Sequence, residues 1–367
     1  MKTAPGLLDR LLHLDELIQQ IPSPTFFESQ RSAFILHQFL ELGLAQVTQD
    51  QAGNIFGCLP GGSQPPLVVS AHLDTVFPLG TDLHLQHSTG RIAGPGIGDN
   101  SLGLAGLIGL VWMFKENQVS LPGDLWLAAN TGEEGLGNLR GMRAMVDRFG
   151  PAPVAYLVVE GIGLGDIFHR GTGVERYRVN LHTSGGHPWT APASLSAVHA
   201  AAHLITCLAD LPLPAIPHTT LNVGMVSGGT SINTIAAHAV FELDLRSEES
   251  QALEELAGKA REIIQQASRP EVKVEIEEIG ARPSGYIPAN HRLVQLAEQC
   301  LLEQGIKPQL TCSSTDANLP LSRGFPALCL GLTRGSGAHT LAECIETEPV
   351  LAGMAQLFNL VCRIWTA

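Results

Sequence analysis

His72 and Asp74, in the segment VVSAHLDTVFP, are the residues whose types and spacing most directly suggest chemistry. The apolar residues before them predict a buried strand, and residues two apart in a strand face the same side. A metal-bound imidazole needs an acceptor for its second ring nitrogen, which a carboxylate at this spacing can supply. The ordinary alternative is a polar pair at a strand end, so the pair gains meaning only from the rest of the chain.

Acids and a second histidine follow other apolar segments. Asp99 lies in GPGIGDNSLG, Glu133 and Glu134 end DLWLAANTGEEG, Glu160 ends AYLVVEG, and His339 lies in RGSGAHTLAE. Asp99 could simply cap the following helix, and the others could be ordinary loop or strand-end residues. If the four acids converge, however, their charges repel, and burying even one unpaired ion is costly. Two divalent cations would balance the four charges.

Imidazole and carboxylate ligands without a thiolate suit zinc, with cobalt or manganese as possible substitutes. We expect one ion on His72 and Glu160 and the other on Glu134 and His339. Asp99 would bridge the two ions. Such a centre keeps open positions for a water molecule, whose pKa two metal ions would lower.

Three further acids have expected roles around these ligands. Glu133 stands beside a ligand without being one, and is therefore free to act as general base and then as proton donor. Asp74 would hold the ring of His72. Glu343, four residues after His339, would hold that second ring in the same way.

The elements that must position these residues alternate between strand and helix. Apolar strands are predicted at 53–61, 67–76, 124–134 and 153–161, with a buried helix over 101–117. This order predicts an α/β domain with a mostly parallel sheet covered on both faces. The candidate ligands follow the carboxyl ends of strands, where open α/β sheets place their sites.

The pattern changes after Gly173. Strand and helix patterns follow in the order β-α-β-β-α-β, which is typical of a self-contained two-layer module. We therefore predict a catalytic domain formed by residues 1–172 and 283–367, interrupted by a lid domain of residues 173–282. Within the lid, His199 and His203 share a helix face but lack the glutamate of H-E-x-x-H, so we expect them to pack inside it.

Composition excludes several classes of protein. The chain has 367 residues, 44% of them hydrophobic, and a net charge of −13, which disfavours nucleic acid or an anionic membrane as a partner. Seven scattered cysteines without CxxC spacing indicate reduced thiols, and we expect a cytoplasmic protein. The amphipathic N-terminal segment is unlike a signal peptide, and no apolar run reaches the length of a membrane span.

The ordered motifs HLDTV, GDN, GEEG, VEG and GAHTLAE resemble those of metallopeptidase family 20, the co-catalytic zinc hydrolases. That family includes tripeptide aminopeptidase, carboxypeptidase G, aminoacylase, acetylornithine deacetylase and succinyl-diaminopimelate desuccinylase. The resemblance covers nearly the whole chain, including the lid and the STDAN and GAHT segments. It implies the ligand set given above, with Glu133 as base and Asp99 as bridge, and a cis peptide bond between Asp99 and Asn100.

The resemblance also implies residues that spacing could not identify. His187 in SGGHPW matches a lid histidine that reaches the active site, often from a partner subunit, and would stabilise the oxyanion. Asn233 in TSINTI and Arg246 in LDLRS match positions that contact substrate, and a guanidinium suits a terminal carboxylate. Their structural alternatives are a pairing of Arg246 with Glu242 or Asp244, and a turn capped by Asn233.

We therefore predict a di-zinc hydrolase that cleaves an amide bond with metal-activated water and Glu133. The foremost candidate is an exopeptidase acting on short peptides, with a homodimer formed through the lid. An N-acyl-amino-acid deacylase, of the acetylornithine deacetylase or desuccinylase type, shares all of this chemistry. A protein of another class, an inactive peptide-binding homologue, would keep the fold without turnover.

Overall fold

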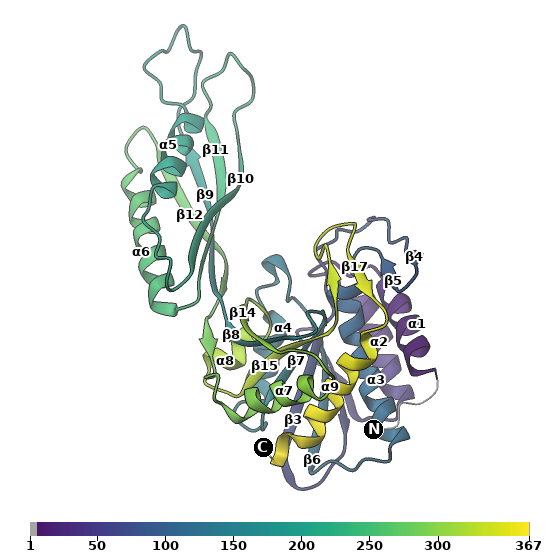
Figure 1. The fold of residues 1–367 in the computed structure, drawn as a ribbon. Helices are drawn as coiled ribbons and strands as arrows, with labels where there is room; N and C mark the ends of the chain where they lie inside the picture. Colours follow the sequence, from purple (N-terminus) through teal and green to yellow (C-terminus); the bar gives the residue numbers. More distant parts are fainter. Residues whose placement is uncertain (1–5, 367) are drawn as a thin grey trace. The chain divides into compact units, whose positions relative to one another are not determined.

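The computed structural model describes residues 6–366 (Figure 1). The chain divides into two compact units. The first unit runs to Gly171 and resumes at Tyr286, and the second spans Thr172–Gly285. These limits lie close to the expected lid boundaries at residues 173 and 282.

A nine-stranded sheet organises the first unit, in the order β1-β2-β6-β3-β7-β15-β8-β13, with β14 paired to β8. Its strands are β1 (Ala45–Gln49), β2 (Ile55–Leu59), β3 (Gln64–His72), β6 (Gly123–Asn130), β7 (Tyr156–Ile162), β8 (Asp166–Gly171), β13 (Gly285–Tyr286), β14 (Gln309–Ser313) and β15 (Ala327–Thr333). The central pairs β6–β3, β3–β7 and β7–β15 are parallel. The carboxyl ends of these strands therefore meet at one edge of the sheet.

The central strands are buried because both faces of the sheet are covered. Val68 and Val69 of β3 and Leu125 and Leu127 of β6 are almost completely buried. Continuous apolar runs of this kind are typical of parallel strands covered on both faces. The mixed α/β fold with a large, mostly parallel sheet confirms the fold class expected from the sequence.

Helices fill the space around this sheet. They are α1 (Leu7–Gln19), α2 (Ser29–Glu41), α3 (Gly103–Glu116), α4 (Arg140–Phe149), α7 (Arg292–Leu302), α8 (Asn318–Ser322) and α9 (Val350–Arg363), with short 3-10 turns η2 (Gly135–Gly137) and η3 (Ile364–Thr366). Helix α3 packs against β3 and β7 as well as against α1 and α9. It is the most central helix of this unit, and its N-terminus lies beside the sheet edge described above.

Helix α3 continues an irregular helical turn, η1 (Ile97–Leu102), and the two form one apolar segment of 20 residues. Ile97–Glu116 is long and apolar enough to cross a membrane, whereas the sequence pattern suggested no run of that length. Its most apolar window is 89% buried inside the protein. The segment is therefore accounted for as the core helix of the sheet.

A small second sheet of the first unit carries one candidate ligand. Its order is β16-β17-β5-β4, with β4 (Gln86–Ser88), β5 (Arg91–Ala93), β16 (Gly335–Ser336) and β17 (Cys344–Glu346). The loop between β16 and β17 contains His339, which has a left-handed φ of 65°. A short antiparallel pair thus fixes both ends of the His339 loop.

The second unit has the predicted β-α-β-β-α-β order. Its elements are β9 (Gly173–His182), α5 (Ala197–Ala209), β10 (Thr219–Gly228), β11 (His238–Ser247), α6 (Ser250–Gln266) and β12 (Lys273–Arg282). The four strands form an antiparallel sheet in the order β10-β11-β9-β12, and both helices pack against it (Figure 1). Tyr177, Val179, Phe241 and Leu243 point toward the helices and belong to a core separate from that of the first unit.

Candidate metal centre

His72 is the last residue of β3, and its ring is oriented by its neighbour two residues on. Its Nδ1 lies 2.9 Å from the main-chain oxygen of Asp74 and 3.7 Å from a carboxylate oxygen of the same residue. The expected contact with Asp74 is thus made chiefly by the main chain rather than by the carboxylate. Because a carbonyl oxygen only accepts, Nδ1 must carry a proton. A neutral ring would therefore offer its Nε2 lone pair to a metal ion, whereas a protonated ring donates from Nε2 to a carboxylate.

The His72 Nε2 atom faces two carboxylates. It lies 3.0 Å from Asp99 Oδ1 and 3.5 Å from Glu160 Oε2. The side chain of His72 is only 2% exposed, whereas those of Asp99 and Glu160 are 18% and 17% exposed. The imidazole is therefore held inside the protein while the two acids reach the surface of the site.

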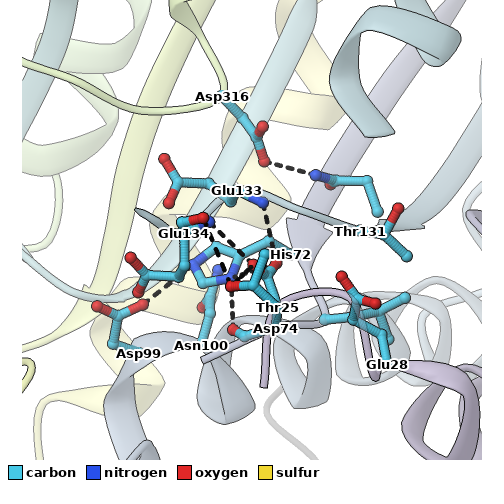
Figure 2. Close-up of polar contacts among 12 residues, drawn as sticks. Thr25, Glu28, His72, Asp74, Asp99, Asn100, Thr131, Glu133, Glu134 and Asp316 are labelled. Carbon is cyan, nitrogen blue, oxygen red and sulfur yellow. Dashed lines mark hydrogen bonds and ion pairs between the residues drawn. The ribbon is translucent and has the colours of Figure 1, made fainter. Parts of the chain in front are cut away.

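A second imidazole repeats this arrangement on the other side of Asp99. His339 Nε2 lies 3.0 Å from Asp99 Oδ2 and 3.1 Å from Glu134 Oε1. Asp99 thus gives one oxygen to each histidine, and Glu134 lies close to it (Figure 2). The five expected ligands come from five distant segments and converge on a single carboxylate.

The separations fit two tetrahedral ions. Two nitrogen or oxygen donors at 2.0–2.1 Å from a tetrahedral zinc ion lie about 3.3 Å apart. The four N···O separations around Asp99 range from 3.0 to 3.5 Å. In addition, donor atoms of His72, Asp99 and Glu134 all lie within 4.8 Å of one another. The residues present therefore suit a pair of divalent cations that share Asp99.

The carboxylate of Asp74 fixes the loop that carries the two adjacent glutamates. It accepts hydrogen bonds from the main-chain N–H groups of Glu133 and Glu134, both at 2.9 Å, and from the hydroxyl of Thr25 at 2.8 Å (Figure 2). Burial opposes ionisation of Asp74, but the His72 imidazole and the two amides together lower the pKa of its carboxyl. A buried anion thus holds the turn that follows β6.

Glu343 supports Asp99 rather than His339, contrary to the expectation from spacing. Its buried carboxylate accepts hydrogen bonds from the N–H groups of Gly96 at 3.3 Å, Gly98 at 2.7 Å and Asp99 at 2.8 Å. Burial and the nearby Asp99 charge raise the pKa of Glu343 to about 7. The carboxylate reaches the turn because β17 pairs with β5, which precedes that turn in the chain.

Asn100 ties the Asp99 turn to the strand that carries Glu160. Its amide donates to the Val159 oxygen at 2.8 Å and accepts from the Gly161 N–H at 3.0 Å, so it binds the residues on both sides of Glu160. The Asp99–Asn100 peptide bond is cis, as expected. The motif GDN marked this position, but no sequence signal indicated that the asparagine side chain would set the distance between two ligands.

The protonation of the metal-free cluster follows from this crowding of acids. Burial raises the pKa of Glu134 and that of Glu160 to about 7. Hydrogen bonds with Asp99 and Glu134 raise the pKa of His339 to about 10. Burial would also raise the pKa of Asp99, but the hydrogen bonds from the two imidazoles outweigh it and lower that pKa. Without metal, protons therefore occupy the space between the ligands.

Asp316 is a residue of the site that sequence reasoning did not single out. It is completely buried, and its Oδ2 accepts a hydrogen bond from the amide of Asn130, the last residue of β6, at 2.6 Å. Burial and the charge of nearby Glu133 raise the pKa of Asp316 well above its usual value (Figure 2). The sequence signal that could have identified Asp316 is its place in STDAN, a segment that resembles one of the family's.

The three expected substrate residues lie in the second unit. His187 and Asn233 are exposed, and their segments are joined by a hydrogen bond from the Ile235 N–H to the Gly186 oxygen at 2.8 Å. Asn233 also accepts from the Ser231 hydroxyl at 3.0 Å within its own turn. These two candidates are therefore close neighbours in the fold.

Arg246 lies at the opposite end of the same sheet. It pairs in register with Val174, near the start of β9, and its guanidinium donates to Asp244 at 2.7 Å, the structural alternative considered above. His238, at the other end of β11, lies beside the segment of His187, and the eight residue steps from it to Arg246 span roughly 26 Å. Within a single chain, Arg246 therefore lies far from His187 and Asn233.

Comparison with known proteins agrees with this site. The profile of the peptidase family M20/M25/M40 matches residues 68–363, which include every ligand candidate. The chain belongs to this family. It is accordingly a hydrolytic enzyme of the peptidase and amidohydrolase type.

Individual relatives differ in their described activities. A probable carboxypeptidase of Aspergillus oryzae is 30% identical over 271 residues, which are 66% of this chain and 60% of that protein. An acetylornithine deacetylase of Photorhabdus laumondii is 28% identical over 156 residues, or 41% and 40% of the two chains. The structure of aminopeptidase PepT from Bacillus cereus has a TM-score of 0.79 and 24% identity, covering 98% of this chain and 99% of that one. The last similarity establishes a shared fold.

The raised pKa values predict how the stability of the metal-free protein depends on pH. The folded chain retains protons on Glu134 and Glu160 up to about pH 7 and on His339 up to about pH 10, above their ordinary values of 4.5 and 6.5. It therefore binds more protons than the unfolded chain in this range, and stability should fall as pH rises. We expect the denaturation midpoint of chelator-treated protein to fall between pH 5 and 9, and added zinc to reverse the loss. A flat or rising profile would contradict this protonation scheme.

Asp316 should behave as a neutral hydrogen-bonding group. Asp316→Asn preserves shape and an acceptor for Asn130, so we expect unfolding stability within about 0.5 kcal/mol of the wild type. Asp316→Ala leaves the buried Asn130 amide without this partner and should cost about 1–3 kcal/mol. Urea denaturation at pH 7.5 measures both variants. If Asn is as destabilising as Ala, the ionised carboxylate is required after all.

Proposed function

We propose that the protein is a di-metal hydrolase, with zinc as the foremost metal, and that it cleaves the amide bond of short peptides as an exopeptidase. The observation that carries this proposal is the position of Asp99, whose two oxygens each lie 3.0 Å from a different imidazole nitrogen. One ion would be held by His72 and Glu160 and the other by Glu134 and His339, with Asp99 common to both.

When bound, the two ions supply a polarised carbonyl and a coordinated water of lowered pKa. Glu133 is the base of the proposed reaction, since it follows β6 beside the ligand Glu134 and its main chain is anchored by Asp74. Its carboxylate takes a proton from the attacking water and later donates it to the departing amine. Asp74 fixes the main chain of the base and of the neighbouring ligand by accepting hydrogen bonds from both of their N–H groups.

We further propose that the substrate-binding site is completed by residues of two chains. The segment of His187 lies near His238 at one end of β11, and Arg246 lies roughly 26 Å farther along that strand, so one chain cannot place both on a dipeptide. A homodimer through the second unit would let a partner subunit supply the oxyanion-stabilising imidazole while Arg246 binds a carboxylate. Arg246 would then have to exchange its hydrogen bond with Asp244 for one with the substrate carboxylate.

The second candidate is an N-acyl-amino-acid deacylase. It is favoured by the similarity to the acetylornithine deacetylase of Photorhabdus laumondii. The water, the base and the metal ligands would be the same, and only the groups recognised on either side of the amide would differ. We also propose a cytoplasmic location, in keeping with seven cysteines that form no disulfide within the described residues 6–366.

Hydrolysis by the zinc-loaded protein tests these proposals. Di- and tripeptides should be cleaved faster than N-acetyl and N-succinyl amino acids, and the reverse order would favour the deacylase. Glu133→Gln should lower kcat by about 10²–10⁴-fold while metal content stays the same, because it removes a base and no ligand. Glu254→Gln, at an exposed position of α6, is the control. No turnover of any substrate by fully loaded protein would support the inactive binding homologue.

A further inference from the structure

A groove in the second unit brings together a different set of metal-binding side chains. It has a volume of about 560 Å³ and lies between α5 and the C-terminal part of α6. His199, His203 and Cys207 of α5 line it, and the remaining lining is apolar except for Gln266, Arg269, Ser194 and Ser196. The two histidines were expected to pack inside the lid, but both are exposed and face this groove.

The spacing of these three residues places them on one face of the helix. Residues four apart in an α-helix are neighbours on its surface, and His199, His203 and Cys207 follow each other at that interval. Cys207 Sγ lies 3.7 Å from His203 Nε2. The imidazole and the thiol are therefore already turned toward each other in the groove.

That separation suits two ligands of one metal ion. With a Zn–S distance of about 2.3 Å and a Zn–N distance of about 2.0–2.1 Å, tetrahedral geometry sets the two donors about 3.6 Å apart. A weak S–H···N hydrogen bond would also fit, but it would not require an open groove with a second imidazole one turn away. His199 and Cys207 are separated by roughly 12 Å of helix, so a single ion would take Cys207 with His203.

We propose that this groove is a second, separate metal site, which binds zinc or a similar thiophilic divalent ion through His203 Nε2 and Cys207 Sγ. Water fills the remaining positions of the ion. On binding, the Cys207 thiol loses its proton to solvent and the thiolate forms the metal–sulfur bond, without any change of oxidation state. The site is independent of the proposed hydrolase function, because none of its residues belongs to the first unit.

Cobalt spectroscopy of the reduced full-length protein tests the proposal. A thiolate bound to Co²⁺ gives an intense near-ultraviolet charge-transfer absorption, whereas the centre around Asp99 contains only imidazole and carboxylate donors. The absorption should grow to one thiolate-bound cobalt per chain and disappear when zinc is added. It should be absent in Cys207→Ser, and His203→Gln should require at least tenfold more cobalt for the same signal.

Cys362→Ser is the matched control, because Cys362 is also a partly buried helical thiol but lies outside the groove. This variant should keep the full absorption, and Cys207→Ser should keep the peptide-hydrolysis rate of the wild type. Absence of the absorption at millimolar cobalt would overturn the proposal. So would an absorption that survives in Cys207→Ser or that is lost equally in Cys362→Ser.

Discussion

Mutual repulsion among buried carboxylates is the constraint on which this structure depends. Asp99, Glu133, Glu134 and Glu160 gather at one edge of the central sheet, and Asp74 lies buried directly behind them. Such a cluster is stable only if positive charge is placed among its members. Without metal, protons and two imidazoles meet this need, because burial and then the neighbouring carboxylates raise the pKa values of Glu134 and Glu160 to about 7.

The protein holds these repelling groups in place through buried anchors that are not themselves ligands. Asp74 fixes the turn after β6, Glu343 fixes the turn before α3, and Asn100 joins that turn to β7. Asp74 and Glu343 bind main-chain N–H groups of turns, and Asn100 binds main-chain groups of β7 on both sides of Glu160. Loops with free N–H and C=O groups can thus be given a single geometry at the end of a sheet.

The sequence predicts those parts of the fold that depend on local periodicity. The runs that became β3, β6 and β7 are continuous and apolar, and the second unit follows its expected order of strands and helices. Helix α4 and strand β8 were not anticipated, because α4 is short and polar on one face and the residues of β8 lack an apolar run. Helix α9 was missed although it is apolar, since its place in the fold follows from packing against β15 and α3.

Candidate ligands could be found because several strand ends carried residue types of one chemistry. The side chains that hold these ligands in place could not be found from the sequence, because their roles depend on contacts between segments far apart in the chain. Spacing suggested that Glu343 would hold His339, yet strand pairing carries it to the N–H of Asp99 instead. Likewise, Asp316 joins the site only because its hydrogen bond to Asn130 spans 186 positions of the sequence.

Metal stoichiometry is the most direct test of the central claim. Cys207→Ser protein, which lacks the thiolate of the second groove, should be saturated with zinc, desalted and analysed by mass spectrometry of its metal content. The account predicts two zinc ions per chain, and fewer than two when Asp99→Asn is added, since both ions share that carboxylate. A content of one ion or none in the protein with Asp99 intact would contradict it.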